Sequence, residues 1–358
     1  MTPYNIEIFH PDFTFVQHYT VGDVPYQYDY LSPVENTVSL PYDANVKRGD
    51  YIYIRGGVMP YFGVITTITV NSTIKGYAEL SYKPFISLFN APILFDTDLQ
   101  GTSTLEQVLS DIITAYYVSN SDAEQNIDGL TVQTISSTPS WGFNLKSDVA
   151  GLAKTVINLY DVLIVRSLTK YRVGFYATPD FSNQAITLEI GVKEVNIQVI
   201  EADLPTVMDK NIVLTDNSES INKVVVYDET DMATNRVYYS HPDGSYDMVD
   251  DNRITPVIFT TKTAMALSGT FEDAADHVAA ETLGQSNYNN LIELTVANDD
   301  TLVMPAGFTI GQEVDIISNG TVYRSIFTGM ARNGSTKLTF GSIRMDLTKI
   351  LKGVLNNA

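Results

Sequence analysis

The stretches "GDYIYIRGGVMPYFGVITTI" (residues 49–68) and "GQEVDIISNGTVYRSIFTGM" (residues 311–330) follow one pattern. Each begins with glycine, alternates apolar with polar residues, turns at Gly-Gly or Asn-Gly and alternates again. That pattern is typical of a β-hairpin. At a constant spacing of 262 residues, four further pairs stay apolar and four positions are identical: Gly49/Gly311, Ile54/Ile316, Tyr61/Tyr323 and Thr66/Thr328.

Two interpretations of this repeat are open. Unrelated β-hairpins share turn and alternation rules, so chance alone gives some likeness. The interpretation we favour is a duplicated β-domain, which gives one chain two similar surfaces. Three such chains in a ring would then present six similar domains to a six-fold partner. Duplication predicts that the two hairpins match in topology and that Ile54 and Ile316 occupy equivalent core positions.

The composition limits the class of protein. A chain of 358 residues, 44% apolar and 18% charged, is expected to fold into several domains. It has no cysteine, which excludes disulfides, thiol catalysis and thiolate metal sites. The start "MTPYNIEIFHPDF" lacks the features of a secretory signal, and no apolar run reaches the ~18 residues that cross a bilayer. We expect no membrane insertion.

The net charge is −20. A field of this sign repels phosphate, so we expect no stable binding to nucleic acid. Two interpretations stay open: ordinary solubility, or a surface past which nucleic acid moves without adhering.

The first two predicted regions differ in their periodicity. Residues 1–97 read as strands, with Ile52 and Ile54 of "YIYIR" on one face and Tyr51 and Tyr53 on the other. Residues 98–204 read as an α+β domain with two helices, followed by strands in "DVLIVRSL", "YRVGFYA" and "AITLEIG". The first helix, in "STLEQVLSDIITAYYV", has Ser103 and Glu106 as a capping box. The second is predicted to start at Ser147 and to carry Leu152, Val156, Ile157 and Tyr160.

From residue 205 the sequence again reads as mainly β. Strands are predicted in "INKVVVYDE", in "RVYYSHPDGSYDMV" around a Pro-Asp-Gly turn, and from "NLIELTV" to "KLTFGSIRMDL". A helix in "TFEDAADHVAAETLG" has Thr270 and Asp273 as a cap pair and Gly284 as its stop. The predicted fold class is α+β, mainly β: two similar β-barrel-like domains with α+β insertions. Its predicted domains are 1–97 (first barrel), 98–204 (α+β), 205–230 with 288–347 (second barrel), 231–287 (insertion with a β-hairpin and one helix) and 348–358 (tail).

The residues that could carry chemistry form no recognised motif. The four histidines, His10, His18, His241 and His277, lie in no HExxH or HxH spacing. His277 has Asp273 and Glu281 one helical turn away on either side, which fits a solvated helix face better than a metal site.

Other candidates are equally weak. The acidic run Asp243, Asp247, Asp250 and Asp251 lacks the alternate spacing of calcium ligands, so we favour an exposed loop. Trp141 could stack on a sugar, but a core or interface aromatic is the commoner case. No nucleophile elbow, phosphate loop or dinucleotide-binding glycine motif occurs. We therefore predict no catalytic, cofactor-binding or metal-binding residue, and a protein that is not an enzyme.

Two runs carry a resemblance to a known family. The segment "INKVVVYDETDMATNRVYYSHPDGSYDMVDDNRITPV" and the C-terminal "GQEVDIISNGTVYRSIFTGMARNGSTKLTFGSIRMDL" resemble the tail-hub proteins, or baseplate hubs, of bacteriophages and prophages. The order of parts is similar across essentially the whole chain. The resemblance implies a homotrimer whose two barrels per chain imitate a hexamer.

The resemblance also implies partners and a location. The hub caps the tail tube, contacts the distal tail ring, surrounds the tape-measure C-terminus and holds a tail fibre, spike or lysin protein, while DNA passes through its channel. This implies a virion protein of the tail tip, assembled in the host cytoplasm. Many relatives continue into a peptidoglycan-cleaving or host-binding region, whereas this sequence ends at Ala358, which counts against a lytic or receptor-binding role. The alternative function, from a different class, is a tail-associated cell-wall hydrolase or a carbohydrate-binding host-recognition protein. A channel for DNA would further place acidic residues on the ring axis and the tyrosine-rich strands at subunit contacts.

Overall fold

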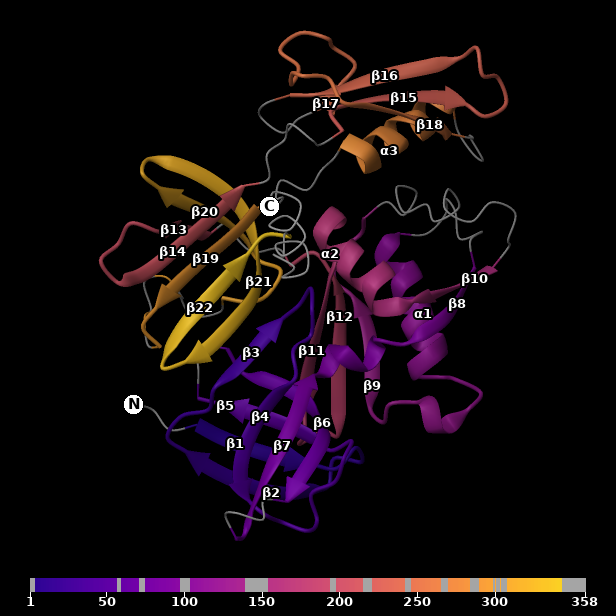
Figure 1. Cartoon of the computed structure of the whole chain (residues 1–358). Helices are drawn as coiled ribbons and strands as arrows, with labels where there is room; N and C mark the ends of the chain where they lie inside the picture. Colours follow the sequence, from indigo (N-terminus) through magenta and orange to yellow (C-terminus); the bar gives the residue numbers. More distant parts are fainter. Residues whose placement is uncertain are drawn as a thin grey trace, which may run out of the picture.

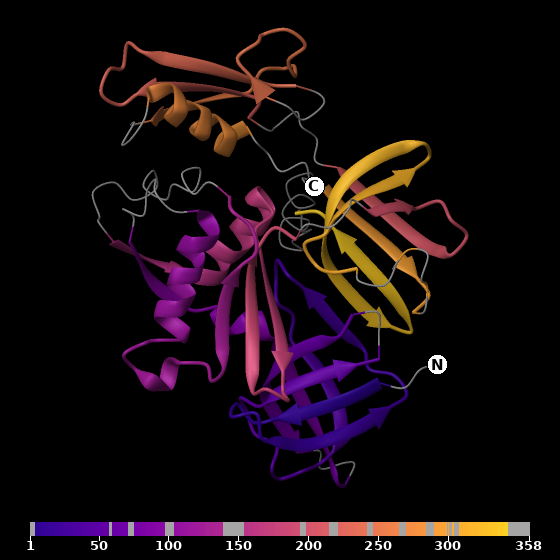
Figure 2. The same ribbon diagram turned by 180° about the vertical axis from the view of Figure 1, so that it is seen from behind.

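The computed structural model describes residues 4–56, 59–70, 75–96, 104–138, 154–193, 198–214, 221–241, 246–264, 270–283, 290–298, 300, 303 and 308–342. As predicted, this part of the chain is α+β and mainly β, with two curled sheets (Figures 1 and 2). An α+β unit packs beside them, and a smaller sheet with one helix lies apart from the rest (Figure 1). No helix in these ranges is long and apolar enough to cross a membrane.

The first sheet has six strands in the order β2-β1-β5-β6-β7-β4. Alternate residues of β1 and β7 are buried, as expected for strands with one face on a core, whereas the first five residues of β6 are all buried. Its strands are β1 (Tyr4–Phe9), β2 (Phe15–Val21), β4 (Asn36–Pro41), β5 (Tyr51–Arg55), β6 (Tyr61–Val70) and β7 (Tyr77–Pro84).

The second sheet has the order β13-β20-β21-β22-β19-β14, and β3 pairs with β21 in addition. β3 (Tyr26–Asp29) comes from the region that forms the first sheet, so the two sheets share a strand connection. The remaining strands are β13 (Gln198–Glu201), β14 (Val207–Leu214), β19 (Asn290–Val296), β20 (Glu313–Ser318), β21 (Thr321–Asn333) and β22 (Ser335–Phe340). The exact domain boundaries stay a prediction.

The duplicated hairpin is confirmed strand for strand. In the first copy Ile54 pairs with Tyr61, and in the second Ile316 pairs with Tyr323. Both isoleucines are buried, at 1% and 0% exposure. The next pairing is interrupted by a bulge at the same place, between Ile65 and Thr67 in one copy and between Phe327 and Gly329 in the other. Equal register and an equal bulge are more than the general rules of hairpins require.

The loop entering each hairpin is also repeated. Gly49 and Gly311 both have positive φ (94° and 82°), and their N–H groups donate to the carbonyls of Ile65 and Phe327 at 2.9 and 2.8 Å. The next residues, Asp50 and Gln312, are both 1% exposed. Each side chain accepts the N–H three residues upstream: that of Lys47 at 2.7 Å and that of Thr309 at 3.4 Å.

The copies diverge where their surroundings differ. Tyr53 and Phe62 form an edge-to-face aromatic pair in the first hairpin, whereas the equivalent Asp315 and Arg324 form an ion pair at 2.9 Å in the second. That contact holds the pKa of Asp315 below its ordinary value. The first pair lies near Phe181, 5.6 Å from the Tyr53 ring, while the second faces solvent and Arg324 is 47% exposed. The outer strand differs too, because β1 is antiparallel to β5 but β13 is parallel to β20.

The α+β unit covers one side of the first sheet. α1 (Leu105–Tyr117) packs on a three-stranded sheet in which β12 (Ala185–Gly191) lies between β11 (Gly174–Asp180) and β9 (Leu130–Thr134). A two-stranded sheet pairs β8 (Pro92–Asp96) with β10 (Lys154–Asn158). Short helical turns complete the unit: η1 (Phe85–Phe89), η2 (Ala123–Gln125), the π-turn η4 (Leu159–Ile164) and α2 (Val165–Tyr171).

The first helix is confirmed, but its predicted capping box is wrong. Thr104 is the N-cap, and its hydroxyl accepts the N–H of Gln107 at 3.2 Å. Ser103 lies outside the described residues. Glu106 turns inward, is 0% exposed and accepts the Thr138 N–H at 2.7 Å. The buried carboxylate of Glu106 needs hydrogen-bond donors, and Thr138 supplies one, so Glu106 does not form the predicted capping box.

The second helix was predicted in the wrong place. Val156 and Ile157 lie in strand β10, and residues 147–153 are outside the described ranges. "DVLIVRSL", predicted as a strand, forms the end of η4 and the start of α2 instead. Asn158 starts this helical run by accepting the N–H of Asp161 at 3.0 Å. The apolar run "VLIV" (residues 162–165) is too short to show a periodicity that separates a buried strand from a buried helix.

The insertion after β14 has its own core. β15 (Lys223–Asp228), β16 (Asn235–Ser240), β17 (Tyr246–Asp247) and β18 (Phe259–Ala264) form one sheet, and α3 (Phe271–Leu283) covers one face. The predicted strands, helix and cap are confirmed: Thr270 and Asp273 each bond the other's N–H through the side chain at 3.2 Å. The Pro-Asp-Gly turn and Gly284 are outside the described residues.

The paired glycines give a test of the fold. Alanine at either position costs ~1–2 kcal/mol because an L side chain disfavours positive φ. A Cβ on Gly49 meets no atom within 4 Å, whereas a Cβ on Gly311 would overlap the hydroxyl of Tyr176. We expect Gly311→Ala to lower the midpoint of thermal unfolding more than Gly49→Ala. Adding Tyr176→Phe should recover part of the difference, and equal midpoints for the two alanine variants would contradict this account.

Candidate assembly site where the two sheets join

The two curled sheets are joined by strand β3, which we call the β3 junction. β3 lies antiparallel to the end of β21, with Asp29 opposite Gly329 and Tyr26 opposite Arg332. Figure 1 shows β3 extending from the first sheet toward the second. The pairing buries this part of β21, where Met330 is 5% exposed. The chain thus builds a strand-to-strand contact between its two repeated units.

Tyr30, the residue after β3, bonds to three separate parts of the chain. Its N–H donates to the carbonyl of Thr328 in the second sheet at 2.9 Å. Its carbonyl accepts the hydroxyl of Tyr160 from η4, and its own hydroxyl accepts the N–H of Phe175 in β11 at 2.9 Å. Tyr30 is 0% exposed, and this burial raises its pKa well above the ordinary value. The residue therefore stays neutral and fixes the second sheet against the α+β unit.

A cluster of tyrosines supports the junction from the first sheet. The ring of Tyr61 lies 5.5 Å from that of Tyr26, 6.1 Å from that of Tyr28 and 5.3 Å from that of Tyr82. The Asn36 amide donates to the Tyr61 hydroxyl at 3.2 Å. Edge-to-face contacts of this kind contribute ~0.5–1.5 kcal/mol each beyond their burial.

One tyrosine of the first hairpin is likewise covered within the chain. Tyr51 is 3% exposed, whereas Tyr53 is half-buried and lies beside Phe181, which stacks on Phe9 with ring centroids 3.8 Å apart. Tyr51 is therefore not available for a subunit contact, and for the other tyrosine-rich strand surfaces the expectation of subunit contacts stays a prediction. Aromatic strands fit an internal interface as well as an external one, and here the α+β unit supplies it.

Arg332, near the end of β21, contacts two residues from the start of the chain at the β3 junction. It is 9% exposed, its guanidinium lies 4.5 Å from the centroid of the Tyr4 ring, and its Nε is 3.7 Å from Asp23. Burial lowers the pKa of Arg332 from its ordinary value. This cation–π contact links the end of β21 to the first strand of the chain.

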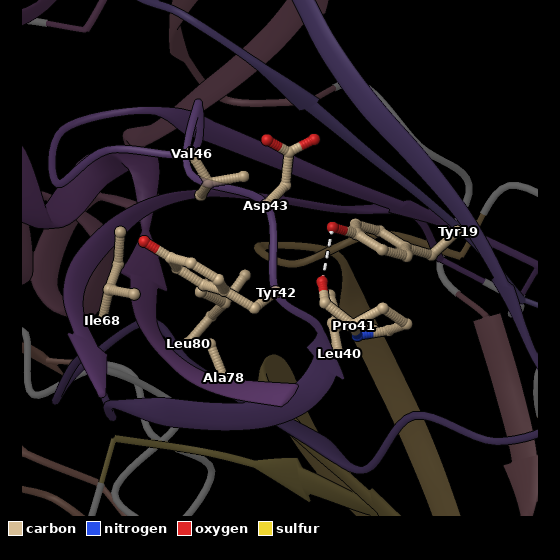
Figure 3. A pocket seen from close by; sticks show the side chains of 9 residues that line it. All are labelled: Tyr19, Leu40, Pro41, Tyr42, Asp43, Val46, Ile68, Ala78 and Leu80. Carbon is tan, nitrogen blue, oxygen red and sulfur yellow. Dashed lines mark hydrogen bonds between the residues drawn. The ribbon is translucent and has the colours of Figure 1, made fainter. Parts of the chain in front are cut away.

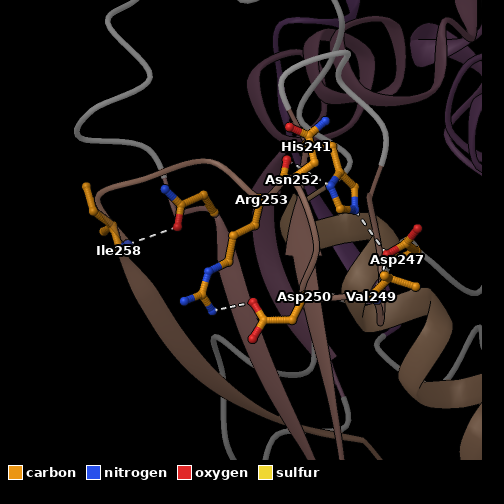
Figure 4. Close-up of polar contacts among 8 residues, drawn as sticks. His241, Asp247, Val249, Asp250, Asn252, Arg253 and Ile258 are labelled. Atoms are coloured by element: carbon orange, nitrogen blue, oxygen red, sulfur yellow. Dashed lines mark hydrogen bonds and ion pairs between the residues drawn. The ribbon is translucent and has the colours of Figure 1, made fainter.

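The candidate histidines lie in separate places. His10 contacts the buried Asp50 at 2.8 Å, and His18 contacts Asn5 at 3.2 Å. His241 bonds Asp247 at 3.0 Å (Figure 4). The side chains of His277 and Glu281, and the whole of Trp141, lie outside the described residues. Within the described part of the chain, no three His, Asp or Glu side chains form a group that could hold a metal.

The acidic run is divided among different partners. Asp247 contacts His241 and accepts the N–H of Val249 at 2.6 Å, while Asp250 pairs with Arg253 at 2.6 Å (Figure 4). Asp251 is exposed, and Asp243 is outside the described residues. Carboxylates that point to separate partners do not converge as calcium ligands must.

A pocket on the first sheet is too small for a metabolite. Tyr19, Tyr42, Val46 and Ile68 are among the side chains that line it (Figure 3). Its volume is about 10 Å³, room for roughly one water molecule. Tyr19 donates to the carbonyl of Pro41 beside it at 3.0 Å. A cavity of this size cannot hold a substrate or a cofactor.

Comparison with known proteins gives the fold. No protein-family model matches the sequence, and no curated protein matches it either. The structure is similar to the 43 kDa tail protein of prophage MuSo2 from Shewanella oneidensis, at 10% identity and a TM-score of 0.54, over 96% of this chain and 98% of that one. It is also similar to the prophage tail protein gp18 from Listeria monocytogenes EGD-e, at 13% identity and a TM-score of 0.50, over 98% of both chains.

The chain therefore has the fold of prophage tail proteins along nearly its whole length. The resemblance found in the sequence is confirmed at this level. The β3 junction was missed by the sequence analysis. Its signal was present in "YQYDY", where Tyr26, Tyr28 and Tyr30 alternate with polar residues as in a strand.

Tyr30 and Tyr82 form a matched pair for testing the junction. Tyr30→Phe leaves the buried N–H of Phe175 without its acceptor, which costs ~1–3 kcal/mol. The hydroxyl of Tyr82 is buried without a partner among the described residues, so Tyr82→Phe removes no hydrogen bond. We expect only Tyr30→Phe to lower the midpoint of thermal unfolding clearly. A similar fall in the midpoint for both variants would mean that the hydrogen bond between the Phe175 N–H and the Tyr30 hydroxyl is not the cause of the lost stability.

Proposed function

We propose that this chain is a structural, non-enzymatic component of a phage or prophage tail, and that it forms a homotrimeric hub. The observation that carries the proposal is the duplicated hairpin, with equal register, equal bulge and equal entry loop. A fold shared along the whole chain with prophage tail proteins supports it.

The mechanism is geometric. Closed rings form when head-to-tail interfaces satisfy their rotation. Three chains with two similar units each give six similar units around one axis, while the rest of the chain keeps three-fold symmetry. Such a ring joins a six-fold tail tube and distal tail ring to a three-fold tip.

The proposed partners follow from this position. They are the distal tail ring on one side, the C-terminus of the tape-measure protein in the channel, and a fibre, spike or lysin protein at the tip. The location is the virion, at the tail tip or baseplate, after assembly in the host cytoplasm.

The oligomeric state tests this function directly. Native mass measurement should give three times the 39.6 kDa mass of the chain, alone or with the distal tail ring added. A stable monomer under both conditions would remove the reason for the duplication. Cleavage of purified peptidoglycan by the ring would contradict the non-enzymatic role.

The acidic charge gives a second test. Each chain carries a net charge of −20, and acidic residues facing a channel would repel DNA phosphate within a Debye length of ~8 Å. We expect a structure of the assembled ring to show a net-negative surface on its axis, and the ring not to retard duplex DNA in a gel at low salt. A neutral or basic axial surface would mean that the charge serves solubility alone.

A further inference from the structure

Among the residues that the structure describes, one edge of β6 has no pairing strand over residues 67–70. The pairing of β5 with this edge ends at Val64, opposite Tyr51. On the other edge β7 continues to Val70, opposite Ala78. Among the described residues no strand pairs with the first edge beyond the bulge, and the side chain of Val70 is 58% exposed.

The equivalent edge in the second sheet is occupied. At the spacing of 262 residues, Thr67–Val70 corresponds to Gly329–Arg332, the segment of β21 that pairs with β3. Burial differs accordingly: Met330 and Arg332 are 5% and 9% exposed, whereas their equivalents Ile68 and Val70 are half-buried and 58% exposed. The same structural position is thus filled in one copy and open in the other.

The sequence does not protect this open edge. An unpaired strand edge can pair with another chain, and proteins block it with lysine, proline, inward charges or a bulge. Residues 66–70 read "TTITV", with no lysine, proline or charge, and the bulge between Ile65 and Thr67 does not block pairing, since β21 has the same bulge and still pairs with β3. An unprotected β-branched edge is typical of a surface that is covered in the assembled state.

We propose that the Thr67–Val70 edge of β6 accepts strand β14 of a second copy of this chain. The inference deepens the proposed function and rests on the homotrimer. A second copy is the occupant because the chain itself fills the equivalent position, with β3. A ring of alternating repeated units then uses one kind of junction throughout, within chains and between them.

Strand β14 is the counterpart of β3. β4 and β19 are equivalent because each pairs with the strand that follows the bulged one, β7 or β22. β3 is the strand that comes before β4, and β14 is the strand before β19 once the insertion is set aside. β14 is the last strand of its sheet, so one edge pairs with β19 and the other is open among the described residues. Its Met208 is 59% exposed, and the ammonium group of its Lys210 is held by Asp203 and Ser318 of the same chain.

Lysines on the β6 edge give the first test. Thr67 and Thr69 are exposed, but their equivalents are a buried glycine, Gly329, and the half-buried Ala331. Thr67→Lys with Thr69→Lys should therefore meet the incoming strand and convert the trimer to a folded monomer. The matched control is Thr261→Lys with Thr263→Lys, on two exposed threonines of the edge strand β18, which should stay trimeric.

The outcomes separate this inference from the function on which it rests. If the wild type is a trimer and the Thr67→Lys, Thr69→Lys variant is a trimer too, the pairing at the β6 edge is wrong, while the proposed trimeric hub is unaffected. A monomeric wild type, with or without the distal tail ring, overturns both. Circular dichroism of each variant establishes that it is folded.

Disulfide trapping gives the second test, in a chain that has no cysteine of its own. Val70→Cys is combined in turn with Met208→Cys, Asp209→Cys and Asn211→Cys, because a disulfide needs Cα atoms about 4.4–6.8 Å apart. At least one double variant should give a covalent trimer on a non-reducing gel after oxidation. Each single variant should stay a monomer there, since the two sites differ. No covalent trimer from any pair, while native mass still shows a trimer, would overturn the pairing with β14.

Discussion

The arrangement of this chain depends on the hydrogen bonds around Tyr30. One buried residue joins three regions: Thr328 of the second sheet, Tyr160 of η4 and Phe175 of β11. Its backbone groups cannot be left unpaired at 0% exposure without a penalty of ~1–3 kcal/mol each. The position of β3 on β21 is thereby coupled to the packing of the α+β unit, so the two repeated units are held at one relative orientation.

Local rules account for the parts that the sequence predicts well. Alternation, a turn pair and a glycine of positive φ define each hairpin within about 20 residues, and both hairpins have the expected register with Ile54 and Ile316 buried. The helix in "TFEDAADHVAAETLG" carries its own cap and follows the same logic.

Tertiary context decided the parts that sequence patterns did not predict. Glu106 does not bond the N-terminus of its own helix but accepts the N–H of Thr138, which lies 32 residues away. The residues after Asn158 are helical because they pack inside the α+β unit. The β3 junction pairs Asp29 with Gly329, and no short-range pattern encodes such a partner. The replacement of the Tyr53–Phe62 pair by Asp315–Arg324 shows the same dependence, because identical backbone positions face a neighbouring unit in one copy and water in the other.

The pairing of β3 with β21 also sets an order of events during synthesis. A ribosome adds about 5–20 residues per second, so the ~300 residues between Asp29 and Gly329 take on the order of 15–60 s to appear. During that interval β3 has no partner strand, and the first sheet cannot be oriented against the second. The contact that fixes the relative position of the repeated units therefore forms only after Gly329 has been synthesised. A nascent chain that has not yet reached this residue cannot hold its two sheets at the orientation of the folded protein.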